Sequence, residues 1–173
     1  PNKNFLMLGE KPLAYYIFET LLSIPIINNV YCFTSQPKVL DLLPEGVRIL
    51  PRPIRLDDDS IQANELFYEA VKAIDDELLV ICQIPGPFVE KQSIMEGISE
   101  VKSGRFDSAF AAKRLQTYCW HKNHPVNYNP LEMVQTQELE PVFAETSGFY
   151  VFKREDYMQS RSRINGNVRI VEV

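Results

Sequence analysis

The sequence predicts an α/β protein in which helices are layered on a mostly parallel sheet. Short β-rich runs alternate with amphipathic helical segments along the chain, which is the pattern of parallel strands joined by helices. Hydrophobic residues make up 45% of the 173 residues, enough for the core of one domain. We therefore expect residues 1–173 to form a single domain, without a second complete one.

The elements follow from hydrophobic periodicity and from turn residues. The predicted helices span 12–23, where Pro12 occupies the favoured first turn, 60–74 and 90–101. The predicted strands span 29–33, 47–50, 77–83 and 107–113, with another at 167–173. No strand precedes the first loop, so we expect the first strand and the C-terminal end of the domain to lie outside the sequence shown.

The pattern changes after Lys113, where an aromatic and turn-rich stretch is followed by a return to strand. Residues 114–146 are predicted to form an inserted β-rich arm. Its aromatic residues, which include Tyr118, Trp120 and Tyr128, form either a small satellite core or a surface for a partner.

Composition excludes several classes of protein. The net charge is −5 and no basic run offsets it, which argues against wrapping nucleic acid or binding an anionic membrane surface. No apolar stretch approaches the roughly 20 residues of a membrane span, and no signal peptide is visible, so a cytoplasmic location is expected.

The cysteines do not suggest a disulfide framework, because their number is odd and two lie in apolar strands. We expect Cys32, Cys82 and Cys119 to be reduced thiols. Cys119, His121 and His124 offer three zinc ligands, but no fourth ligand lies near them, so no metal site is predicted within the chain.

Polar residues follow several of the predicted strands and precede the first helix. In such sheets ligands bind outside the carboxyl ends of the strands, so the segments after Phe33, Leu50 and Ile81 are expected around one cleft. Lys3 and Asn4 form a short loop of the kind that holds a nucleotide phosphate.

Arg52 follows a strand at the same edge, where its fixed donors suit a base or a phosphate. The acidic run after it has a structural interpretation: Asp59 and Gln62 match a capping box for the next helix. Gln83 ends a buried strand at the cleft, and it either caps the following loop or contacts a ligand.

Four spaced segments of this chain resemble the acylneuraminate cytidylyltransferases. The first is Pro1, Lys3 and Asn4 in the family's Pro-Arg-Lys-Asn. The second is Arg52, Pro53, Leu56, Asp59 and Ser60 in its Arg-Pro-x-x-Leu-x-x-Asp-Thr/Ser. The third is Gln83, Pro85 and Pro87 at the end of a strand, and the fourth is Gln137, Leu139, Pro141 and Tyr150.

The resemblance implies a Rossmann-like fold of the nucleotide-diphospho-sugar transferase type, with 114–146 as a dimerisation arm of a homodimer. It implies an enzyme that joins CTP to an acidic nine-carbon sugar such as N-acetylneuraminate, giving a CMP-sugar and pyrophosphate. Magnesium would bridge the triphosphate to carboxylates outside the chain shown.

The resemblance also implies a role for each matched polar residue. Lys3 and Asn4 would be the catalytic residues, with Lys3 on the phosphates and Asn4 on the ribose or α-phosphate. Arg52, Asp59 and Ser60 would read the cytosine. The residues facing the sugar acid would be Gln83, Gln137 and Tyr150.

The chain departs from the family at the acceptor strand. Relatives read Arg-x-Asn-Gly-Ala-Ile-Tyr where residues 144–150 read Ala-Glu-Thr-Ser-Gly-Phe-Tyr, so the arginine and asparagine that hold the sugar-acid carboxylate are replaced. An acidic pair is likewise replaced by the residues at 34–37. Two alternatives therefore stay open: another acceptor such as 3-deoxy-manno-octulosonate, or a catalytically degenerate nucleotide-binding or assembly subunit.

Overall fold

The computed structural model describes residues 3–173, so the expected role of Pro1 in the first motif lies outside the described residues. The helices of the described part are α1 (Leu13–Leu22), α2 (Ala63–Lys72), α3 (Lys91–Lys102) and α4 (Arg154–Ser160). The longer strands are β3 (Val30–Thr34), β4 (Val47–Pro51), β5 (Leu78–Cys82), β6 (Ser108–Leu115), β9 (Val142–Lys153) and β10 (Val168–Glu172). Two short hairpins pair β1 (Met7–Leu8) with β2 (Lys11–Pro12) and β7 (Trp120–His121) with β8 (His124–Pro125).

The α/β class is confirmed. One sheet has the order β10-β6-β9-β5, in which β10 is parallel to β6 while β9 is antiparallel to both β6 and β5. Three of its four strands therefore run in one direction. A second, parallel ladder joins β3 to β4.

Most predicted elements are present within one to three residues. The predicted helix at 60–74 begins later, at Ala63, because a 3-10 turn at Ile54–Asp57 and a bend occupy the residues before it. The short helix α4 was not predicted.

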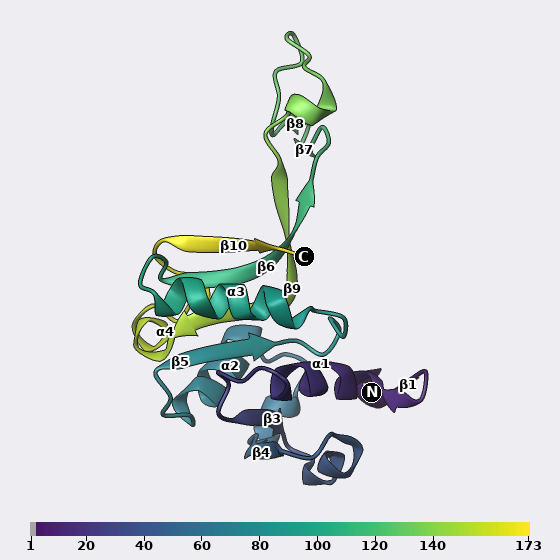
Figure 1. Cartoon of the computed structure of the whole chain (residues 1–173), viewed down its shortest axis with the longest axis vertical. Coiled ribbons are helices and arrows are strands. Elements are labelled where there is room, and N and C mark those ends of the chain that lie inside the picture. Colours follow the sequence, from purple (N-terminus) through teal and green to yellow (C-terminus); the bar gives the residue numbers. More distant parts are fainter. Residues whose placement is uncertain (1–2) are drawn as a thin grey trace.

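Strand β9 has two buried faces, because alternate side chains point to opposite sides of a sheet. Phe149 and Val151 pack beneath α3. Tyr150 and Phe152 pack on the opposite face with residues of α2 and α4. The sheet is therefore a central layer between helices (Figure 1).

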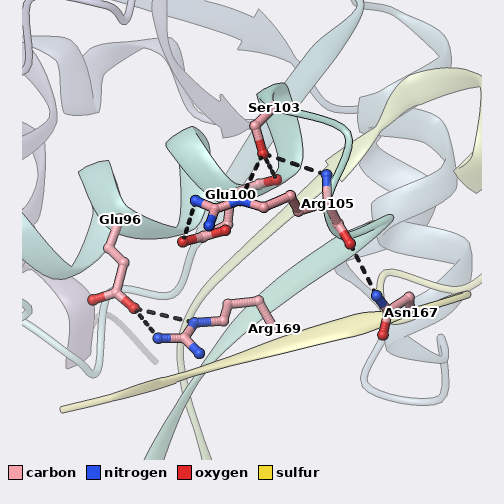
Figure 2. Close-up of polar contacts among 6 residues, drawn as sticks. All are labelled: Glu96, Glu100, Ser103, Arg105, Asn167 and Arg169. Carbon is pink, nitrogen blue, oxygen red and sulfur yellow. Dashed lines mark hydrogen bonds and ion pairs between the residues drawn. The ribbon is translucent and has the colours of Figure 1, made fainter.

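Polar contacts join the exposed side of α3 to β10 and to the loops that lead into β6 and β10 (Figure 2). Arg169 binds Glu96 at 2.7 Å, and Asn167 Nδ2 donates to the Arg105 carbonyl at 2.9 Å. Arg105 also pairs with Glu100 at 2.9 Å. The Arg169–Glu96 pair is exposed to solvent, and the Arg105 side chain is exposed while Glu100 is largely buried, so at least the first pair contributes little to stability.

An arm extends from the sheet where β6 and β9 continue past the other strands (Figure 1). The pairing there runs to Leu115 opposite Val142. Inside the arm, the ring of Tyr128 lies 4.7 Å from that of Tyr118 and 6.1 Å from that of Trp120. The aromatic residues thus form a small internal cluster, although Trp120 stays 57% exposed.

No helix among residues 3–173 is long and apolar enough to cross a membrane.

Phe149→Ala is expected to lower the free energy of unfolding by about 3–5 kcal/mol, since it removes a fully buried ring and leaves a cavity under α3. Urea unfolding measures the loss. Phe88→Ala is the matched control, because Phe88 is 74% exposed and its removal should change stability by less than about 0.5 kcal/mol. Equal effects of the two substitutions would contradict this packing.

Candidate functional site

The carboxyl ends of β3 and β4 are joined by a charged network. The backbone N–H of Arg52 donates to the Thr34 carbonyl at 3.0 Å. The Arg52 guanidinium binds Asp57 at 2.5 Å, and the Ser35 hydroxyl donates to the other oxygen of Asp57 at 2.5 Å. The hydrogen bond from Ser35 and the charge of Arg52 lower the pKa of the Asp57 carboxyl, so it stays ionised.

Arg52 is thus held in place with part of its donor set unused. Its Nε atom is buried and has no hydrogen-bond partner among the described residues. A buried donor without a partner is costly, and a ligand that accepted its hydrogen bond would remove that cost. The contact of Arg52 with a nucleotide stays a prediction.

The acidic run after Arg52 folds differently from the prediction. The Asp58 carboxylate, and not that of Asp59, accepts hydrogen bonds from the Ser60 backbone at 2.8 Å and hydroxyl at 2.6 Å. Gln62 is the N-cap residue of α2 and makes no side-chain capping bond. The predicted capping box between Asp59 and Gln62 is therefore wrong, because the chain makes a local turn before the helix begins. Asp59 and Ser60 lie exposed in that turn.

Lys3 and Asn4 lie in a 3-10 turn, Lys3–Phe5, that precedes the β1–β2 hairpin and α1. Phe5 packs against the apolar cluster shared by α1 and β3, which anchors the turn beside these two elements. Lys3 is exposed. Asn4 Oδ1 is buried and accepts no hydrogen bond within residues 3–173, so it is a second polar atom whose partner could be a ligand.

Gln83 directly follows β5 at the carboxyl end of that strand. Its backbone N–H donates to the Gly148 carbonyl of β9 at 3.4 Å, and its own carbonyl accepts from Gly86 at 3.1 Å. The backbone of Gln83 therefore shapes the loop, while its half-buried side chain makes no recorded hydrogen bond within the described chain. Both interpretations of Gln83 are compatible with this position.

Strand β9 contains a β-bulge beside Gln83. Phe110 pairs with Tyr150 and Ala112 pairs with Glu145, so four residues of β9 lie opposite one residue of β6. Ser147 adopts a positive φ of 58°, and the Thr146 hydroxyl donates to the Ala111 carbonyl at 3.1 Å. Such bulges redirect side chains and occur often near active sites.

The bulge brings Glu145 to Tyr150. Glu145 Oε1 accepts a hydrogen bond from the Tyr150 hydroxyl and one from Arg163 Nη2 at 3.2 Å. Burial, followed by the hydrogen bond to Glu145, raises the pKa of Tyr150, which stays protonated. Tyr150 is fully buried, so in this structure it contacts Glu145 through its hydroxyl and Arg163 through its ring and is not exposed to solvent.

Gln137 lies apart from these residues. It is exposed in a 3-10 turn, Thr136–Glu138, within the arm, and its side chain bonds to Gln135. Figure 1 shows the arm extending away from the sheet. One chain thus brings together Gln83, Tyr150, Glu145 and Arg163, but not Gln137.

The described residues do not offer a ligand set for magnesium. They contain no group of three or more His, Cys, Asp or Glu side chains arranged to hold a metal ion. Asp57, the carboxylate nearest Arg52, already uses both oxygens for Arg52 and Ser35. Cys119, His121 and His124 likewise form no metal group, and the three cysteines are free thiols.

Four residues of the site were not among the predicted site residues: Ser35, Asp57, Glu145 and Arg163. The first two had a signal, because they lie in segments next to the ends of two parallel strands. Glycine within a strand often indicates a bulge, so Gly148 was a sequence signal for irregular pairing near Glu145. Arg163 carried no local signal, since its role depends on contacts far along the chain.

Comparison with known proteins gives one family and several solved structures of the same fold. The family model described as cytidylyltransferase matches residues 1–172. No curated protein matches the sequence.

Three solved structures are similar in fold. A CMP:2-keto-3-deoxy-manno-octonic acid synthetase complexed with CTP has a TM-score of 0.71 and 13% identity, covering 100% of this chain and 83% of that one. The bifunctional IspDF from Campylobacter jejuni has a TM-score of 0.68 and 15% identity, covering 99% of this chain and 44% of that one. The 4-diphosphocytidyl-2C-methyl-D-erythritol synthase from Anaerococcus prevotii has a TM-score of 0.65 and 13% identity, covering 96% and 78%.

At these identities the structural likeness establishes the fold. The family model, in contrast, spans nearly every residue of the sequence, including the Arg52 network and the widened strand β9. This chain belongs to the cytidylyltransferase family.

Proposed function

We propose that this protein transfers the cytidylyl group of CTP to an acidic sugar and releases pyrophosphate. In this reaction a hydroxyl of the sugar attacks the α-phosphate, and the bond from the α-phosphate to the bridging oxygen breaks. The observation that carries the proposal is Arg52, fixed by Asp57 at the carboxyl end of β4 with a buried donor left free, in a chain of the cytidylyltransferase family.

The nucleotide half of the site consists of Lys3, Asn4, Arg52 and the turn at Asp59–Ser60. Phosphoryl transfer depends on positioning and on neutralising charge more than on covalent help from the protein. The exposed ammonium of Lys3 counters phosphate charge. Asn4 holds the ribose by accepting a hydrogen bond from a ribose hydroxyl at its buried Oδ1, or the α-phosphate by donating from Nδ2, while Arg52 reads the base.

The acceptor half consists of Gln83 and the residues that surround the β9 bulge. We propose an acidic nine-carbon sugar such as N-acetylneuraminate as the acceptor, on the match of Gln83 and Tyr150 to the acylneuraminate enzymes. The eight-carbon acid named in the first solved structure is the second candidate. This second candidate is favoured because residues 144–150 lack the arginine and asparagine that hold the carboxylate of the nine-carbon acceptor in the acylneuraminate enzymes.

A screen of acceptors decides between these sugars. Pyrophosphate release is measured with CTP and N-acetylneuraminate, 3-deoxy-manno-octulosonate or 2C-methyl-D-erythritol 4-phosphate. We expect turnover with one of the two sugar acids. Binding of CTP without turnover of any acceptor would favour the catalytically degenerate nucleotide-binding or assembly subunit.

Two substitutions should separate base recognition from phosphate binding. Arg52→Ala is expected to reduce the preference for CTP over UTP by about 1–3 kcal/mol, because a charged hydrogen bond to the base is lost. Lys3→Ala should weaken both nucleotides equally. Calorimetry measures both effects, with Arg105→Ala as the control because Arg105 lies in the loop after α3, pairs with Glu100 and makes no contact with Arg52 or Lys3 in the described part of the chain. Unaltered CTP binding by Arg52→Ala would remove the assignment.

Magnesium dependence stays a prediction, with ligands expected outside the chain shown. The reaction gathers several negative charges that a magnesium ion would balance, and the described residues contain no group of three or more His, Cys, Asp or Glu side chains arranged to hold one. Pyrophosphate release by the complete protein is therefore expected to stop in excess chelator and to return when magnesium is added. An undiminished rate in chelator would show that the reaction does not need the metal.

We further propose that the arm forms a two-fold dimer. Large apolar side chains on it remain in water in one chain: Trp120 is 57% exposed, Met133 68% and Leu131 92%. Burying such side chains is favourable, and a two-fold pair is the commonest closed assembly. A dimer would also give Gln137 a place near the acceptor site of the partner, which a single chain does not provide.

Trp120→Ala is expected to weaken dimerisation by at least tenfold and to lower turnover with it, since Trp120 is proposed as an anchor of the interface. Sedimentation over a hundredfold range of concentration measures the equilibrium. Phe88→Ala is the control, because Phe88 is also a largely exposed aromatic residue, at 74%, but lies off the arm. If the wild-type protein stays monomeric throughout, the shared site is wrong.

A further inference from the structure

Arg163 lies in the loop between α4 and β10 and reaches back over β9. Its Cζ atom is 4.3 Å from the centroid of the Tyr150 ring and 5.1 Å from that of Phe67 on α2. Its Nη2 donates to Glu145 Oε1 at 3.2 Å. Two aromatic rings and one carboxylate therefore fix the plane of the guanidinium, while 23% of the side chain remains exposed.

This arginine has more donors than partners. A guanidinium carries five N–H donors; Arg163 donates one to Glu145 and also acts as a hydrogen-bond donor to the Tyr150 hydroxyl, which leaves others unused. Its Nε is buried without a partner among the described residues, as is that of Arg52. Glu145 also accepts a hydrogen bond from Tyr150, so its charge is shared between two donors.

The surrounding charge favours a second anion. Arg161 lies 3.4 Å above the ring of Tyr68, and no ion pair to it is recorded in the described part of the chain. The charges of Arg161 and Arg163 both act on the Tyr157 hydroxyl, so two guanidinium groups lie in this region, and Glu145 pairs with Arg163. A carboxylate entering beside Arg163 would be attracted by both charges.

The cluster also lies at the correct edge of the sheet. Tyr150 pairs with Ile81 in β5, two residues before Gln83, and the Gly148 carbonyl accepts a hydrogen bond from Gln83. Gly148 is required at this contact, because a Cβ there would lie 2.9 Å from Val89. Arg163 thus reaches the side of the bulge where the acceptor half of the proposed site is located.

We propose that Arg163 binds the carboxylate of the acceptor sugar acid, and that Glu145 and Tyr150 are the positioning residues that hold its guanidinium. This inference rests on the proposed function and adds a residue to it. Arg163 would take the role of the arginine that the acylneuraminate enzymes carry within the strand, where this chain has Ala144, although Arg163 comes from a different segment of the chain. The alternative is that Arg163 only neutralises Glu145 and packs on Tyr150.

The test compares charged and neutral forms of the same sugar. N-acetylneuraminate and 3-deoxy-manno-octulosonate, each with its methyl ester, are titrated calorimetrically into the metal-free protein, and CTP is titrated separately. The wild-type protein is expected to bind one acid at least about tenfold more tightly than its ester, as a charged hydrogen-bonded pair predicts. Arg163→Gln should lose this preference and keep its affinity for CTP.

Further variants separate binding from structural support. Arg163→Lys should retain part of the preference, because it keeps the charge but not the planar fork. Tyr150→Phe should reduce the preference less than Arg163→Gln does, since it removes the hydroxyl that bonds to Glu145 and Ser147 but keeps the guanidinium and the ring beneath it. Arg105→Gln is the control for loss of an exposed arginine. If Arg163→Gln does not fold, Arg163→Lys and Tyr150→Phe decide the question.

The outcomes are distinct. An acid preference that survives in Arg163→Gln, or equal losses of CTP and acid binding with a lower melting temperature, would overturn the role of Arg163. A wild-type protein that binds CTP but prefers neither acid over its ester would overturn it as well, while the nucleotide half of the function would stand. A wild-type protein that does not bind CTP would overturn the proposed function itself.

Discussion

The bulge in β9 is the constraint on which the proposed acceptor site depends. Glu145 and Tyr150 are five residues apart, and in a regular strand they would lie about 16 Å apart on opposite faces. The four residues of β9 opposite Ala111 shorten this separation, so that the Tyr150 hydroxyl reaches Glu145. The same residues turn the Gly148 carbonyl toward Gln83. One local departure from regular pairing therefore assembles contacts from β5, β9 and the loop after α4.

Both halves of the site use the same arrangement of charges. In each, an arginine is held by a carboxylate that also accepts a hydrogen bond from a hydroxyl: Arg52 with Asp57 and Ser35, and Arg163 with Glu145 and Tyr150. In a protein of net charge −5, an arginine without a fixed partner could pair with any of several acidic side chains. Here one carboxylate holds each guanidinium in one orientation, and other N–H donors of that guanidinium stay free. Both arginines retain a buried Nε without a partner in the described chain.

The sequence was sufficient for the elements, but not for the contacts among the residues of the candidate site. Alternation of apolar runs predicted the strands and three helices, and it placed Arg52 directly after a strand, as found, while its contact with a nucleotide stays a prediction. The capping box at Asp59 failed because Asp58 and Ser60 closed a turn first, a competition between two local hydrogen bonds of similar strength. Arg163 could not be predicted, since its contacts depend on a bulge 13 or more residues earlier and on the packing of α2.

The two halves of the site rest on separate ladders. Arg52 follows the β3–β4 pair, whereas Gln83 and the bulge belong to the sheet of β5, and no hydrogen-bonded ladder joins these sheets in the described residues. They meet through apolar packing, in which Cys82 of β5 contacts the cluster that contains Cys32 of β3. Apolar contact is not directional, so it fixes the distance between the halves less strictly than strand pairing would. The relative position of nucleotide and acceptor groups therefore depends on this buried contact, and burial raises the pKa of the Cys82 thiol to about 12, which keeps it protonated and apolar there.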